Sequence, residues 1–163
     1  MANSNPNSGA RSETQAKAGI VRGDPGAPGT SDTSLYDMIG GEKVLRDLVE
    51  TFYDVIEHED AGKLLLVLHR RGHGVAHSRI EQFDFLSGFL GGPRLYVAHH
   101  GHSDVRYMHE HIAIGPAERD AWLNCMSTAI DRVGLDADIK QRLMTPFTRV
   151  ATMLINRDTS ENI

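Results

Sequence analysis

The sequence predicts an all-α domain. Apolar residues recur at intervals of three and four over most of residues 34–157, which is the period of an amphipathic helix. No run alternates between apolar and polar residues in the two-residue period of a strand. Glycine pairs and Gly-Pro steps at residues 40–41, 91–93 and 115–116 interrupt the helical pattern. We expect helices to end or begin at these points.

The first two helices are expected on either side of the Gly40-Gly41 pair. Ser34 is a suitable N-cap for a short helix that ends at Ile39. The segment after Gly41 predicts a long amphipathic helix, because its apolar residues share one face and its charged residues lie mostly opposite. The apolar positions are Val44, Leu45, Leu48, Val49, Phe52, Val55 and Ile56.

The middle of the domain is expected to hold shorter and less regular elements. Residues 64–68 form an apolar run of one or two helical turns, and a loop follows around residues 70–74. Residues 94–104 show only weak periodicity, and a brief helix is expected over residues 104–110. Between these segments lies a helix that is apolar over much of its circumference, so we expect it to be buried on two sides. Its apolar positions are Ile80, Phe83, Phe85, Leu86, Phe89 and Leu90.

The last two helices have clear start signals. Gly115 can act as a cap, Pro116 suits the first helical position, and Glu118 lies in the first turn, where the helix dipole favours a negative charge. This helix is expected to end at Gly134. The final helix opens at Asp136, and Pro146 inside it is expected to cause a kink because the ring removes one backbone hydrogen bond.

The composition limits the domain organisation and the classes of partner. Residues 1–33 contain five glycines and three of the six prolines and no aromatic residue, so we expect a disordered extension before the domain over residues 34–157. Residues 158–163 are expected to be a tail. With 17 Lys and Arg against 22 Asp and Glu, and no basic tract, we expect no nucleic-acid partner. No segment is long and apolar enough for a signal peptide or a membrane span, which favours a cytoplasmic protein without a membrane partner.

Nine histidines are unusual for a chain of 163 residues. His69, His73 and His77 are spaced by four residues, and on one continuous helix they would lie on one face and could hold zinc or nickel. Gly72 and Gly74 interrupt that helix, which favours solvated loop histidines. A histidine-rich metal-binding helical module remains one alternative.

Several motifs resemble one known family. Residues 101–126 read GHSDVRYMHEHIAIGPAERDAWLNCM and are similar to the proximal segment of the group II truncated haemoglobins, which are also called two-over-two haemoglobins. Residues 35–41 (LYDMIGG), 52–53 (FY) and 89–96 (FLGGPRLY) resemble the same family in the same order. The resemblance spans residues 34–156. It implies the truncated globin fold, a two-over-two helical sandwich, with haem b (iron protoporphyrin IX) as cofactor.

The resemblance also implies roles for five residues. His109 matches the proximal histidine that binds the iron, and Tyr53 and Trp122 match polar residues on the opposite, distal side of the haem. His69 stands where an aromatic residue is usual, so it implies either a hydrogen bond to the iron-bound ligand or a bond to the iron in a six-coordinate resting state. Gln82 stands where an apolar residue is frequent and implies a further hydrogen-bond donor.

Other residues are implied as walls of the haem pocket and as partners of the haem propionates. Tyr96 and Arg106 are the candidates for the propionates, and Met108 stands where a basic residue is common in the family. Candidates for the apolar walls are Phe83, Phe85, Leu86, Phe89, Met108, Met126 and Phe147.

The function implied by the resemblance is the binding of oxygen, nitric oxide and carbon monoxide at the iron. Hydrogen bonds from Tyr53, Trp122, His69 and Gln82 would stabilise bound oxygen and slow its release. We therefore expect redox chemistry, either nitric oxide oxidation to nitrate or peroxidase-like reduction of peroxide, with an unidentified reductase. Oxygen storage or transport, and a non-haem histidine-rich module, are the alternatives. The sequence does not define the oligomeric state.

Overall fold

The computed structural model describes residues 32–158, and all regular elements in that range are helical. The expected extension and tail fall almost entirely outside it, on residues 1–31 and 159–163. The all-α prediction is confirmed. In chain order the elements are α1 (Leu35–Ile39), α2 (Gly41–His58), the 3-10 turn η1 (Asp60–Gly62), α3 (Lys63–Arg71), α4 (Val75–Phe89), α5 (Leu95–His100), α6 (Val105–His109), α7 (Pro116–Val133) and α8 (Ala137–Met153).

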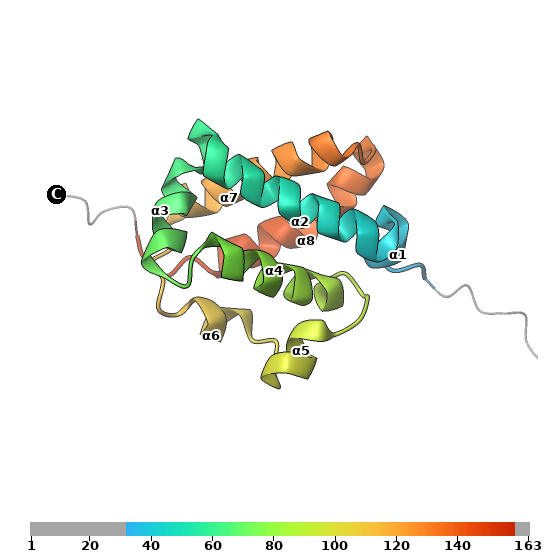
Figure 1. Ribbon diagram of the computed structural model, residues 1–163, viewed down its shortest axis with the longest axis horizontal. Helices are drawn as coiled ribbons and strands as arrows, with labels where there is room; N and C mark the ends of the chain where they lie inside the picture. The colour runs from blue at the N-terminus through green and yellow to red at the C-terminus, as the bar shows by residue number, and fades with distance from the viewer. Residues whose placement is uncertain (1–31, 159–163) are drawn as a thin grey trace, which may run out of the picture. The chain divides into compact units, whose positions relative to one another are not determined.

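The four longest helices, α2, α4, α7 and α8, form the body of the domain (Figure 1). The most extensive packing joins α2 to α7, α7 to α8 and α2 to α4. The arrangement is therefore a sandwich of two helix pairs, α2 with α4 and α7 with α8. The short helices α5 and α6 follow α4 and lie along its far side from α2, as Figure 1 shows.

The core lies where α2 meets α7. The predicted apolar face of α2 is buried almost completely from Leu45 to Ile56, and only Val44 at its start is partly exposed. It packs against the buried apolar side chains of α7, which are Cys125, Met126, Ala129 and Ile130. Burial of each large apolar side chain stabilises the fold by about 1.5–3 kcal/mol. Among the described helices, none is long and apolar enough to cross a membrane.

The predicted helix ends are confirmed by their capping bonds. Ser34 Oγ accepts a hydrogen bond from the Asp37 backbone N–H at 3.1 Å, and Glu118 accepts one from Gly115 N–H at 2.8 Å. Gly40 joins α1 to α2 with φ +109°, and a Cβ there would lie 2.8 Å from Val44 Cγ2. Glycine is therefore required at this corner for both conformation and space.

Two expectations about the middle of the chain are wrong, and one helix there, α5, was not predicted. Helix α3 is longer than one or two turns, and α5 forms over residues 95–100, where the periodicity is weak. Helix α5 is stabilised by its contacts with α4, which a local pattern does not show. Ile80 is 65 % exposed, because α4 faces α2 through Phe83 and Leu86 and leaves Ile80 on the solvent side.

Candidate functional site

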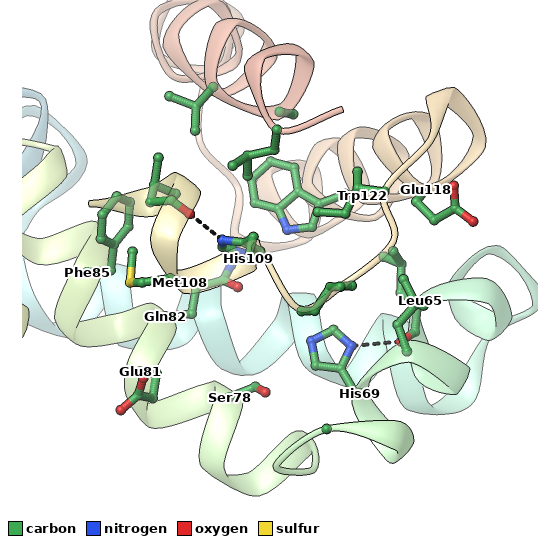
Figure 2. A pocket seen from close by; sticks show the side chains of 18 of the residues that line it. Leu65, His69, Ser78, Glu81, Gln82, Phe85, Met108, His109, Glu118 and Trp122 are labelled. Carbon is green, nitrogen blue, oxygen red and sulfur yellow. Dashed lines mark hydrogen bonds between the residues drawn. The ribbon is translucent and has the colours of Figure 1, made fainter. Parts of the chain in front are cut away.

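A cavity lies between the two helix pairs and the segment that contains α5 and α6 (Figure 2). It collects side chains from α2, α3, α4, α5, α6, α7 and α8, which are far apart in the sequence. Ten of the residues that the sequence predicted for the site line it: Tyr53, His69, Gln82, Phe85, Leu86, Tyr96, Met108, His109, Trp122 and Phe147. Phe89, a further wall candidate, also lines it.

Three other candidates lie outside the lining of the cavity. Arg106 is exposed on the outer side of α6, away from the cavity that Val105, Met108 and His109 line. Met126 is completely buried one turn beyond Trp122, where α7 packs on α2. Phe83 lies on the side of α4 that faces a second hollow, with the Arg46 guanidinium over its ring. In this structure Met126 and Phe83 belong to the core instead.

His109 is presented to the cavity by the short helix α6. Asp104 caps this helix by accepting hydrogen bonds from the backbone N–H groups of Arg106 and Tyr107. The Nδ1 of His109 lies 2.8 Å from the carbonyl oxygen of Val105. A carbonyl can only accept, so Nδ1 carries the proton and Nε2 keeps its lone pair. Burial lowers the pKa of His109, which favours the neutral imidazole that binds metals.

His69 on α3 is oriented by the same kind of hydrogen bond as His109. Its Nδ1 donates to the carbonyl oxygen of Leu65 at 2.7 Å, so its Nε2 also carries a lone pair. Burial lowers the pKa of His69 as well. The ring meets that of Tyr53 edge to face at 5.5 Å between centroids. Figure 2 shows His69 and His109 on different elements around the same cavity.

Tyr53, which is buried, and Gln82, which is partly buried, form a hydrogen-bonded pair across α2 and α4. The Tyr53 hydroxyl donates to Gln82 Oε1 at 2.9 Å, and burial raises the pKa of Tyr53, so the hydroxyl keeps its proton. Gln82 Nε2 is buried without any hydrogen-bond partner, and it is the only side-chain nitrogen or oxygen of this kind among residues 32–158. Buried polar groups in folded proteins are nearly always paired. This unpaired amide therefore indicates a position for a ligand.

Trp122 is held over the cavity by two phenylalanines. Its ring lies 5.4 Å from Phe52 and 5.6 Å from Phe147, the latter edge to face. Figure 2 shows the indole between His109 and the side chains of α8. Because both neighbours are themselves buried, the indole has one well-defined place in the wall.

The cavity also has residues that the sequence did not single out as site residues. His73, His77, Glu81 and His111 line its more polar part, and Glu81 pairs with His77 at 3.5 Å and with His100 at 3.0 Å. The sequence predicts His73 and His77 to be solvated loop histidines, but His77 lies on α4, and only the fold brings these residues together around the cavity. Apolar lining was also missed at Leu65, Leu68, Ile112, Ile114, Val150 and Leu154. The sequence signal for Ile112 and Ile114 is their position directly after His109.

The structure gives no support to a histidine-rich divalent-metal module. Gly72 and Gly74 separate α3 from α4, so His69, His73 and His77 do not share one helix. Within residues 32–158 no group of three or more His, Cys, Asp or Glu side chains is placed to hold a metal ion.

Comparison with known proteins gives the family. A family model described as bacterial-like globin matches residues 34–156. The group 2 truncated hemoglobin YjbI of Bacillus subtilis (strain 168) is 33% identical over 134 residues, which cover 82% of this chain and 97% of that protein. The chain belongs to the group II truncated haemoglobins.

Solved structures of truncated haemoglobins share the fold. The group II two-on-two haemoglobin of the plant pathogen Agrobacterium tumefaciens is 32% identical, with a TM-score of 0.72, and the match covers 79% of this chain and 98% of that one. The truncated oxygen-avid haemoglobin of Bacillus subtilis is 33% identical, with a TM-score of 0.66 over 76% of this chain and 99% of that one. The expected two-over-two fold is confirmed.

Membership of the globin family implies that this truncated haemoglobin binds haem and, through it, diatomic gases. The cavity fits such a cofactor in three respects. It presents the lone pair of a buried neutral histidine, its walls are mostly apolar and aromatic, and it contains an unpaired amide donor. Tyr96, the remaining candidate for the propionates, lines it from α5.

Proposed function

We propose that this truncated haemoglobin holds haem b through His109 and retains oxygen for redox chemistry, either nitric oxide oxidation to nitrate or peroxide reduction. The observation that supports this proposal best is the unpaired amide of Gln82, because a buried donor without a partner is costly unless a ligand uses it. The bound haem supplies the iron at which such ligands react. Electrons would come from a reductase that is still unidentified.

Gln82 rather than Tyr53 is the donor that faces the ligand in this proposal. The hydroxyl proton of Tyr53 is already used in the bond to Gln82 Oε1, so Tyr53 orients the amide and its Nε2 remains free to donate. The indole N–H of Trp122, from the neighbouring wall, is the second candidate donor. The sequence implied direct donation by Tyr53, and the observed pairing favours an indirect role.

Donors in a buried pocket are expected to slow oxygen release. Bound oxygen carries partial negative charge, and hydrogen bonds to charged groups contribute about 1.5–3 kcal/mol. The relative from Bacillus subtilis described as oxygen-avid supports the same expectation for this chain. A protein that releases oxygen slowly is poorly suited to delivery and better suited to reactions at the iron.

Haem binding through His109 is tested by absorption spectroscopy of the purified protein. We expect a Soret band in the wild type and weak haem retention in His109→Ala. His58→Ala is the matched control, because His58 makes the same Nδ1 bond to the carbonyl four residues earlier but is exposed at the end of α2. Equal haem retention in both variants would refute the assignment.

The donor assignment is tested by stopped-flow measurement of oxygen dissociation. Gln82→Leu should release oxygen about 10- to 100-fold faster, which corresponds to the loss of one strong hydrogen bond. Tyr53→Phe should have a smaller effect, of about several-fold, because it only loosens the amide. A larger effect of Tyr53→Phe than of Gln82→Leu would make Tyr53 the direct donor. Fast oxygen release by the wild type, without turnover of nitric oxide or peroxide, would favour storage or transport.

A further inference from the structure

We propose that His69 gives the cavity a preference for small ligands that carry a proton of their own, such as hydrogen peroxide, by accepting a hydrogen bond through Nε2. This inference rests on the proposed haem site and adds a ligand class to it. Carbon monoxide, nitric oxide, oxygen and fluoride lack such a proton, so they gain no hydrogen bond from His69 and depend on the hydrogen-bond donors of the cavity alone.

A hydrogen bond within α3 determines which ring nitrogen of His69 carries the proton. Leu65 O, at 2.7 Å from Nδ1, is an acceptor only, so the ring proton is on Nδ1 and the lone pair is on Nε2. Leu65 and His69 are four residues apart on α3, so one turn of the helix holds the carbonyl oxygen and Nδ1 next to each other. Hence a neutral His69 cannot donate to a ligand in the cavity. The resemblance left open whether His69 donates to the ligand, and this bond excludes donation by the neutral ring.

His69 shares the cavity with His109, Tyr53 and Gln82. Its ring meets the Tyr53 ring edge to face, and the side chains of His69 and His109 line the same cavity. Figure 2 shows the ring of His69 beside the cavity, with Nδ1 turned toward Leu65 and the other nitrogen turned away from it. The lone pair of Nε2 is therefore available to a ligand inside.

The polar groups of the cavity form a complementary pair. Gln82 Nε2 is a donor without a partner, and His69 Nε2 is an acceptor whose lone pair is not used by Leu65. A ligand with an O–H or S–H group can accept from Gln82 and donate to His69 at the same time. A ligand that only accepts would bond to Gln82 and would place its own lone pairs near that of His69, which is repulsive. The arrangement therefore discriminates by the ligand's proton rather than by its size.

The test compares one probe of each class at equilibrium on the ferric haem protein. Hydrogen sulfide is the probe that donates, and fluoride is the probe that only accepts. We expect His69→Phe to lower the affinity for hydrogen sulfide about tenfold relative to fluoride, the effect of one lost hydrogen bond. His69→Tyr introduces a hydroxyl donor. It should raise the affinity for fluoride and so shift the preference from hydrogen sulfide toward fluoride more than His69→Phe does.

His58→Phe is the matched control, because His58 has the same bond to its own helix but lies outside the cavity. It should bind both probes as the wild type does. In wild type and in both His69 variants the Soret band reports whether the haem site is intact.

Two results would overturn the inference without affecting haem binding. One is an unchanged ratio of the two affinities in His69→Phe with a normal Soret band. The other is a low-spin ferric wild type that becomes high-spin in His69→Phe, because His69 would then be an iron ligand. Absence of a Soret band from the wild type would instead refute the proposed function and this inference together.

Discussion

At the scale of single residues, the positions of a few protons decide what the cavity can do. Tyr53 and Gln82 both bring polar atoms to the cavity, but the bond from the Tyr53 hydroxyl to Gln82 Oε1 leaves only the buried amide nitrogen free to donate. His69 and His109 each give their Nδ1 proton to a carbonyl of their own helix. The residue types alone do not distinguish donors from acceptors here.

The buried state of His69 predicts how stability depends on pH. Burial lowers the pKa of His69 in the folded protein, so between the folded and unfolded pKa values the unfolded chain binds more protons. Stability should therefore fall as the pH drops below the ordinary histidine pKa of about 6.5 and through the lower folded value. His69→Phe should reduce this loss, measured as the urea midpoint of the haem-free protein at about pH 5.5 and about pH 7.5.

Burial also lowers the pKa of His109, so the pH dependence of stability should be weaker in His69→Phe but should not disappear. The exposed His58 provides the control, since His58→Phe should leave the pH dependence of the midpoint unchanged. An equal loss of stability at acid pH in wild type and His69→Phe would contradict this prediction.

At the scale of helices, one arginine fastens α4 to α2. Arg79, with only 17% of its side chain exposed, forms ion pairs with Glu50, Asp54 and Glu57 on successive turns of α2. These carboxylates raise the pKa of the Arg79 guanidinium. The guanidinium also lies 5.6 Å from the centre of the Tyr53 ring. The cluster therefore holds together the two helices that supply Tyr53 and Gln82.

Removal of this arginine should destabilise the domain. Arg79→Met leaves three carboxylates close together without their cation, and because those carboxylates are partly exposed we expect a loss of about 1–2 kcal/mol. The measurement is urea unfolding of the haem-free protein. Arg142→Met is the control, because Arg142 forms a single exposed ion pair with Asp138 on α8 and should contribute less than about 0.5 kcal/mol. Similar losses in both variants would show that the cluster has no special role.

At the scale of the whole molecule, the shape of the cavity depends on how the segment with α5 and α6 is attached to α4. The segment that includes α5 and α6 is attached to α4 by polar side chains: His99 to Asp84 at 2.8 Å, His100 to Glu81 at 3.0 Å, and Ser87 Oγ to the carbonyl of Pro93 at 2.8 Å. His109 lies at the end of that segment. The position of His109 relative to the distal residues therefore depends on side-chain contacts with residues as far back as Glu81, about 28 positions earlier in the sequence.

The attachment predicts an effect on haem retention. Asp84 is buried and its carboxylate pairs with His99, so Asp84→Asn should loosen the wall that supports His109. We expect haem loss to an excess of apomyoglobin to become several-fold faster, by about threefold to tenfold. Glu110→Gln alters an exposed side chain of the same segment and should not change the rate. Equal rates for the two variants would contradict the proposed support.

Features that depend on near neighbours in the chain could be predicted from the sequence. The N-cap at Ser34, the turn at Gly40 and the start of α7 at Pro116 each rest on bonds or conformations within four residues. Helix α5 could not be predicted in this way, because its stability comes from α4 and its own pattern is weak. For the same reason Ile80 was expected inside and lies in solvent.

The sequence by itself determined the all-α class, the family and the segment that presents His109, because periodicity, capping and motif order are properties of the chain. Only the tertiary structure decided that Met126 belongs to the core, that Arg106 faces outward, and that Tyr53 donates to Gln82. The physical reason is distance along the chain. The carbonyls that orient His69 and His109 are four residues away, whereas Tyr53 and Gln82 are 29 residues apart and meet only when α2 packs on α4.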